Sequence, residues 1–132
     1  MRTVRFFIFL IFNLLYRDGK NERIVTYAYS IAVLVIFEFL LVLCGIDFLN
    51  QFVDINIFNV LESLLASEDG VVGTLLMLLF LFNYYIFIKK KHFDHYYNEF
   101  KDSKMNTKKN RKIGYICLIV YWPIMISLAA FF

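Results

Sequence analysis

The sequence predicts an all-α integral membrane protein with three transmembrane helices, and three observations support this fold class. The 132-residue chain is 61% hydrophobic and has a mean hydropathy of +0.63, whereas soluble domains are roughly 45–50% apolar. It contains three apolar stretches of the length, about 20 residues, that crosses a hydrocarbon core as a helix. Its basic residues flank these stretches and do not interrupt them. We therefore expect a single membrane domain over residues 1–132.

Residues 1–23 begin with two arginines and then contain the short apolar run FFIFLIFNLLY. The run is too short to span a bilayer, and the polar segment RDGKNER follows it where a signal peptide has small residues before its cleavage site. We expect a retained amphipathic helix that lies in the membrane interface. Packing of this helix against the helix bundle of the protein's own oligomer is the alternative.

The first predicted transmembrane helix covers residues 24–46, IVTYAYSIAVLVIFEFLLVLCGI, and its only charged side chain is Glu38. A charge at the centre of a bilayer costs roughly 2.5–3.5 kcal/mol or more, so a buried carboxylate needs a partner or a function. Helical spacing places this carboxylate on one face with small, polar and apolar residues: Ser30, Leu34, Glu38, Leu41 and Gly45. We expect that face to point toward protein.

Residues 47–69 keep apolar side chains at helical spacing but are too polar to span a membrane. They predict an amphipathic helix on the outer surface, with Asp54 or Asn56 as its N-cap. The second transmembrane helix follows over residues 70–88 and ends at a run of three lysines.

Residues 89–112 form a basic segment that we expect to continue the second helix into the cytoplasm before a turn near residues 105–110. An aromatic stripe lies along it at i, i+3, i+4 and i+7: Phe93, Tyr96, Tyr97 and Phe100. This stripe either binds a partner protein or docks on the membrane surface or on a neighbouring subunit. Thr107 or Asn106 is the predicted N-cap of the next helix.

The third transmembrane helix is predicted over residues 113–132, and a proline interrupts its hydrogen bonding. Pro123 leaves the carbonyl of Ile119 without its helical donor, which favours a kink. Tyr121 and Trp122 lie beside it, so their polar atoms need partners in protein or water. We interpret Pro123 and Trp122 as a kink or a gate.

The charges predict the orientation of the chain in the membrane. Five of the 14 basic residues lie in residues 1–23 and nine in residues 89–112, while residues 47–69 have none and carry five acidic residues. Basic flanks remain in the cytoplasm, so we expect a cytoplasmic N-terminus and an external C-terminus. The composition, rich in Phe, Ile, Asn, Lys and Tyr, suggests the cytoplasmic (inner) membrane of a bacterium. The expected partner is the lipid bilayer and no nucleic acid, since the basic residues flank apolar spans.

Counting residues along the spans predicts a shared polar layer. Glu38, Thr74 and Ser127 each lie 14 residues from the inner end of their helix, at a depth of about 21 Å. We expect the two hydroxyls to hydrogen-bond the carboxylate within one chain or between subunits. The layer is either functional, with the carboxylate protonated or facing water, or a polar contact that holds the helices together.

No catalytic, cofactor or metal-binding motif is present. His92, His95 and Glu99 fall on one helical face, but three adjacent lysines disfavour a cation, so a solvated face is expected and no metal site is predicted. Cys44 and Cys117 lie at different predicted depths, so we expect two buried thiols without a disulfide. The protein is not expected to be an enzyme.

Two functions remain open. The first is a small oligomer of identical chains that forms an ion-conducting or membrane-perturbing pore with Glu38 in its lumen, because three spans enclose little volume by themselves. The second is a non-conducting membrane anchor or accessory subunit that recruits a soluble or membrane partner through the segment 89–112. In general layout the chain resembles the short multi-span proteins that accompany bacterial antiviral sensors, which would place it in a defence system.

Overall fold

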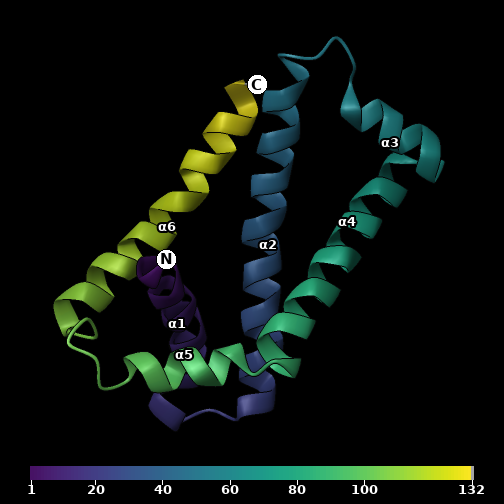
Figure 1. Cartoon of the computed structure of the whole chain (residues 1–132). Coiled ribbons are helices and arrows are strands. Elements are labelled where there is room, and N and C mark those ends of the chain that lie inside the picture. Colours follow the sequence, from purple (N-terminus) through teal and green to yellow (C-terminus); the bar gives the residue numbers. More distant parts are fainter. Residues whose placement is uncertain (132) are drawn as a thin grey trace.

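Helices form every regular element within residues 1–131, the part of the chain that this computed structural model describes (Figure 1). In chain order they are α1 (Arg2–Tyr16), the 3-10 turn η1 (Arg17–Gly19), α2 (Arg23–Asn50), α3 (Ile57–Leu65), α4 (Glu68–Asn83), the π-helical turn η2 (Tyr84–Lys89), α5 (His92–Phe100) and α6 (Lys108–Phe131). The predicted all-α class is confirmed.

Three helical stretches are long and apolar enough to cross a membrane: Arg23–Asn50, Glu68–Lys89 and Lys108–Leu128. They correspond to the predicted helices 24–46, 70–88 and 113–132, of which residue 132 lies outside the described part of the chain. The last one begins earlier than predicted because its first turn is built from basic residues that hydropathy alone excludes. Thr107 caps that turn, since its Oγ1 accepts a hydrogen bond from the Asn110 N–H at 3.1 Å.

The predicted outer amphipathic segment contains the short helix α3, which ends at Leu65 before Ala66 turns into the left-handed region. Its N-cap is Asn56, one of the two expected residues, whose Oδ1 accepts a hydrogen bond from the Asn59 N–H at 3.2 Å. Figure 1 shows α3 beside the start of α4, at the end of the molecule away from α5.

The helix α2 is the centre of the structure and packs against α1, α4 and α6. Figure 1 shows α4 nearest to α2 at the end that carries α5, and α6 nearest to α2 at the opposite end. At the α5 end, α1 packs against both α2 and α6. The buried core is therefore concentrated there, with Phe12, Ile31 and Phe87 among its members.

The helix α1 packs against the other helices of the chain, and its expected place in the membrane interface stays a prediction. Its side chains Phe6, Phe9, Leu10 and Phe12 are buried, and α1 packs against α5, α2 and α6 of the same chain. On the helical wheel the aromatic side chains share an arc with Asn13, which is also buried and whose Oδ1 accepts the Asp18 N–H at 3.0 Å. Packing against protein, the expected alternative, describes this helix, although the contacts are made within one chain.

The prediction of a continuous helix through Lys89–Lys91 is wrong. Lys91 has a φ of 55° and α5 begins only after it, so the chain turns sharply at the end of η2. Two ion pairs then tie α5 to its neighbours: Arg5 with Glu99 at 3.1 Å, and Arg23 with Asp94 at 3.3 Å. The helix lies across the end of the bundle and does not extend away from it (Figure 1).

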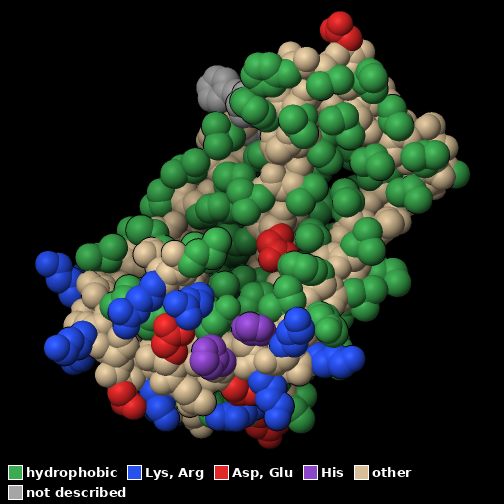
Figure 2. All heavy atoms as spheres, in the orientation of Figure 1, with side chains coloured by type: hydrophobic (Ala, Val, Ile, Leu, Met, Phe, Trp, Pro, Cys, Tyr) green, Lys and Arg blue, Asp and Glu red, His purple; other side chains and the backbone are tan. Residues whose placement is uncertain are grey.

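Charge and hydrophobicity are separated along the molecule. Figure 2 shows the Lys and Arg side chains gathered around the end that carries α5, while hydrophobic side chains cover most of the remaining visible face. One acidic side chain stands among hydrophobic ones in the middle of this face. The exposed apolar side chains lie on all three long helices, for example Ile36, Leu78 and Ile119.

Candidate functional site

The site is built around Glu38, the only acidic side chain in the apolar part of α2. The preceding turns of the same face, Ser30 and Leu34, are buried, and Glu38 itself is partly buried. Farther along, Leu41 and Gly45 are exposed. The predicted inward face is thus confirmed for its first half and wrong for its second half, because α4 leans away from α2 beyond the carboxylate (Figure 1).

The hydrogen-bond partner of the carboxylate is Asn83, the last residue of α4. Its Nδ2 donates to the Glu38 Oε2 at 2.5 Å and to the Leu79 carbonyl of its own helix at 2.8 Å. Asn83 is fully buried and directly precedes the π-helical turn η2. An amide donor bonded to a carboxylate joins α2 to α4 at this level and satisfies one carboxylate oxygen.

Two further polar atoms, one in Asn83 itself and one two turns earlier on α2, are buried without a hydrogen-bond partner among the described residues. They are Oδ1 of Asn83 and Oγ of Ser30, and both residues are 0% exposed. Buried polar groups without protein partners are the usual positions of ordered water. The Asn83 amide therefore has an oxygen that can accept a further hydrogen bond next to Glu38.

The structure does not bring the predicted polar layer together within one chain. Thr74 is exposed on α4, and the exposed Ser127 donates through Oγ to the Pro123 carbonyl of its own helix at 2.7 Å. The depth count assumed parallel spans of equal register, whereas α4 leans across α2 and places Asn83 at Glu38. The signal that was missed is that Asn83 is the only side-chain amide within 70–88.

A cavity of about 410 Å³ adjoins Glu38 on the side away from α4. It is lined by α1, α2 and α6, with Phe7 and Ile11 from the first, Phe37 from the second and Tyr121 from the third. Except for the carboxylate, the Tyr121 hydroxyl and a thiol, its walls are hydrocarbon or aromatic. Glu38 thus lies between an amide on one side and a hollow on the other.

Beside the helix proline, the Tyr121 hydroxyl has the hydrogen-bond partner that was expected, and Trp122 makes a ring contact. The Tyr121 hydroxyl donates to the Phe37 carbonyl at 2.9 Å, and the Trp122 ring packs edge-on against the Phe37 ring, with 5.1 Å between centroids. Pro123 lies inside α6 and is exposed. These contacts hold α6 against α2 at Phe37, the residue directly before Glu38.

The aromatic stripe of α5 is used inside the molecule, which corrects its interpretation as a docking surface. Phe93 is 1% and Phe100 0% exposed. The Phe93 ring stacks on Phe12 with 5.2 Å between centroids, and Phe100 lies 5.4 Å from Phe6. Tyr96 and Tyr97 are partly buried, and both pack against the core that α1 forms with α5. The stripe docks on α1 of its own chain and leaves only the opposite face of α5 exposed.

The remaining candidate residues do not form a site. Both cysteines are free; Cys44 is partly buried and Cys117 is exposed, against the expectation that both are buried. The Glu99 carboxylate binds Arg5, and within the described residues no three His, Cys, Asp or Glu side chains are placed to hold a metal ion.

The fold and the carboxylate define a class: a helical protein with three helices long and apolar enough to cross a membrane, and with an acidic side chain, Glu38, in the apolar part of α2. This composition suggests a membrane location. Comparison with protein-family models, with curated proteins and with solved structures finds no match for this chain.

Proposed function

We propose that the chain is an integral protein of a bacterial cytoplasmic membrane, with its N-terminus inside and its C-terminus outside, which assembles with copies of itself and conducts cations past Glu38. The separation of charges supports the orientation. Residues 47–69 carry no basic residue, and all 14 basic residues lie in residues 1–23 and 89–112, which is the pattern that the positive-inside rule describes.

The geometry of Glu38 is the observation that carries the proposal. One carboxylate oxygen is held by Asn83, and the same side chain lines a hollow between α1, α2 and α6. A carboxylate fixed on one side and open on the other can exchange a proton or attract a cation, and acidic side chains are used in this way in cation pathways.

The proposal requires an oligomer. Three spans enclose little volume, and the exposed apolar side chains of α2, α4 and α6 are free to face lipid or a second copy. A shared path or a local perturbation of the bilayer would form where such copies meet. In the alternative function, a membrane anchor, the aromatic stripe is not available to bind a partner protein because it is packed against α1. A partner would have to bind the exposed face of α5, which includes His95 and Asn98.

Ion flux from sealed liposomes tests this function. We expect cations to cross the membrane of liposomes that contain the wild-type protein, as reported by a cation-sensitive dye. Glu38→Gln should lower the rate of this cation flux on the order of tenfold because the exchangeable charge is lost. Glu62→Gln, which removes a carboxylate from α3, is the matched control and should keep the wild-type rate. Equal flux for Glu38→Gln and wild type, or no flux for either, would refute conduction through Glu38.

A further inference from the structure

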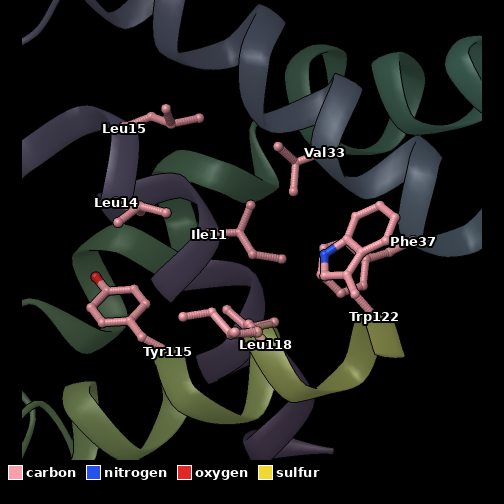
Figure 3. A pocket seen from close by; sticks show the side chains of 9 residues that line it. Ile11, Leu14, Leu15, Val33, Phe37, Tyr115, Leu118 and Trp122 are labelled. Atoms are coloured by element: carbon pink, nitrogen blue, oxygen red, sulfur yellow. The ribbon is translucent and has the colours of Figure 1, made fainter. Parts of the chain in front are cut away.

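A second pocket, of about 260 Å³, lies where α1, α2 and α6 meet (Figure 3). Its walls include Ile11, Leu14 and Leu15 of α1, and Leu118 of α6. Figure 3 shows Tyr115 and Trp122 at opposite ends of the pocket, with Trp122 beside Phe37. Apart from the two aromatic polar atoms, the lining side chains are hydrocarbon. A pocket of this kind accepts an alkyl chain.

Toward the N-terminus of α6, the helix face that lines the pocket becomes a basic surface. Helical spacing places Lys108, Arg111 and Lys112 at i−7, i−4 and i−3 from Tyr115, on the same face. Arg111 forms an ion pair with Asp18 at 3.4 Å, which neutralises that carboxylate. Lys108 and Lys112 are exposed and form no ion pair within the described residues.

These lysines occupy the first turns of α6, whose N-terminus carries no acidic residue. The free N–H groups and the macrodipole of a helix N-terminus are themselves positive. Like charges therefore accumulate at one end of an apolar pocket, and a bound anion would relieve their repulsion. The charge complementarity identifies the ligand as one with an anionic head and an alkyl tail.

We propose that this pocket binds an acyl chain of an anionic phospholipid whose headgroup lies on Lys108 and Lys112. The distance from Tyr115 to Trp122 along α6 is about 10 Å at 1.5 Å per residue, which suits part of one acyl chain. Basic surfaces at the cytoplasmic ends of transmembrane helices are known binding places for anionic headgroups. The inference rests on the membrane orientation proposed above.

The fluorescence of Trp122 tests the proposal, because it is the only tryptophan in the chain. Bromine atoms on acyl chains quench tryptophan on contact. The protein is reconstituted in phosphatidylcholine vesicles with a small fraction of phosphatidylglycerol, and the brominated chains are placed on one lipid or the other at equal mole fraction. We expect brominated phosphatidylglycerol to quench Trp122 more strongly, with a binding preference on the order of tenfold from two lysines.

Two variants and a control localise the effect. Lys108→Ala with Lys112→Ala should abolish the preference, whereas Lys101→Ala with Lys104→Ala, which removes two charges from the α5–α6 turn, should keep it. Val33→Phe fills the pocket from α2 and should reduce quenching by both lipids. Preserved preference in the Lys108 and Lys112 variant would overturn the headgroup assignment.

The outcomes separate this proposal from the one on which it rests. Equal quenching by both brominated lipids means that the protein is in the membrane but the pocket does not select anionic lipid, and the inference fails alone. Absence of quenching, in vesicles where cysteine labelling shows insertion, means that lipid does not enter the pocket, for instance because a second copy fills it. Absence of both quenching and insertion refutes the membrane orientation as well.

Discussion

At the scale of single residues, the pairing of Glu38 with Asn83 explains how an apolar helix tolerates a carboxylate. The sequence indicated that Glu38 needs a partner, and it offered Thr74 and Ser127 from a count of depth. A count of residues along each helix contains no information on the angle at which α2 and α4 cross, so it did not identify Asn83 as the partner. Local signals were more dependable, because N-caps such as Asn56 and Thr107 depend only on neighbours in the chain.

A double-mutant cycle measures the strength of this pair. We expect Asn83→Ala to destabilise the fold, since a carboxylate oxygen loses its donor, by about 1–3 kcal/mol. In the Glu38→Leu background the same change should cost less, with a coupling free energy of about 0.5–2 kcal/mol. The free energy of unfolding in mixed detergent micelles gives these values, and additive effects would show that the hydrogen bond contributes no stability.

Gly114 makes a second residue-scale prediction, because a Cβ at this position would overlap Cδ1 of the fully buried Leu10. Gly114→Ala should lower the free energy of unfolding by about 1–3 kcal/mol through overpacking. Combining it with Leu10→Ala should cost less than the sum of the two changes. Gly45→Ala is the control, since its Cβ would meet no atom within 4 Å. Equal effects at both glycines would mean that α1 does not approach α6 as described.

At the scale of elements, the pairing of α1 with α5 is the feature that the sequence did not predict. The sequence indicated that both helices are amphipathic. This property does not determine whether lipid, a partner protein or another helix covers the apolar face. The turn at Lys91 holds a left-handed residue that costs about 1–2 kcal/mol. Burial of Phe93 and Phe100, at about 1.5–3 kcal/mol each, offsets that cost and brings α5 back onto α1.

Removal of one aromatic side chain should therefore release α5. Phe100→Ala deletes a fully buried ring and should destabilise the pairing by about 3–5 kcal/mol. We expect faster tryptic cleavage after Lys101 and Lys104 in detergent and a lower thermal midpoint. Asn98→Ala, on the exposed side of α5, should leave the cleavage rate unchanged. Identical rates for the two variants would contradict the docking of α5 on α1.

At the scale of the whole molecule, hydropathy and charge together predicted the number and the approximate positions of the long helices, although α6 begins at Lys108 and not at residue 113. This worked because the length of an apolar run and the position of lysines are properties of the sequence alone. The arrangement of the helices depends on side-chain packing instead. The close approach of Leu10 to Gly114 and the turn at Lys91 determine this arrangement. Neither feature produces a periodic pattern of residues in the sequence.

The central claim is that the acidic segment 47–69 and the basic α5 end lie on opposite sides of a membrane. Single cysteines at Ser63 and at Asp102, in a Cys44→Ala and Cys117→Ala background, test it with a membrane-impermeant maleimide applied to spheroplasts. We predict that Ser63→Cys is labelled in intact spheroplasts, and that Asp102→Cys is labelled only after lysis. Labelling of both positions from the same side would contradict the claim.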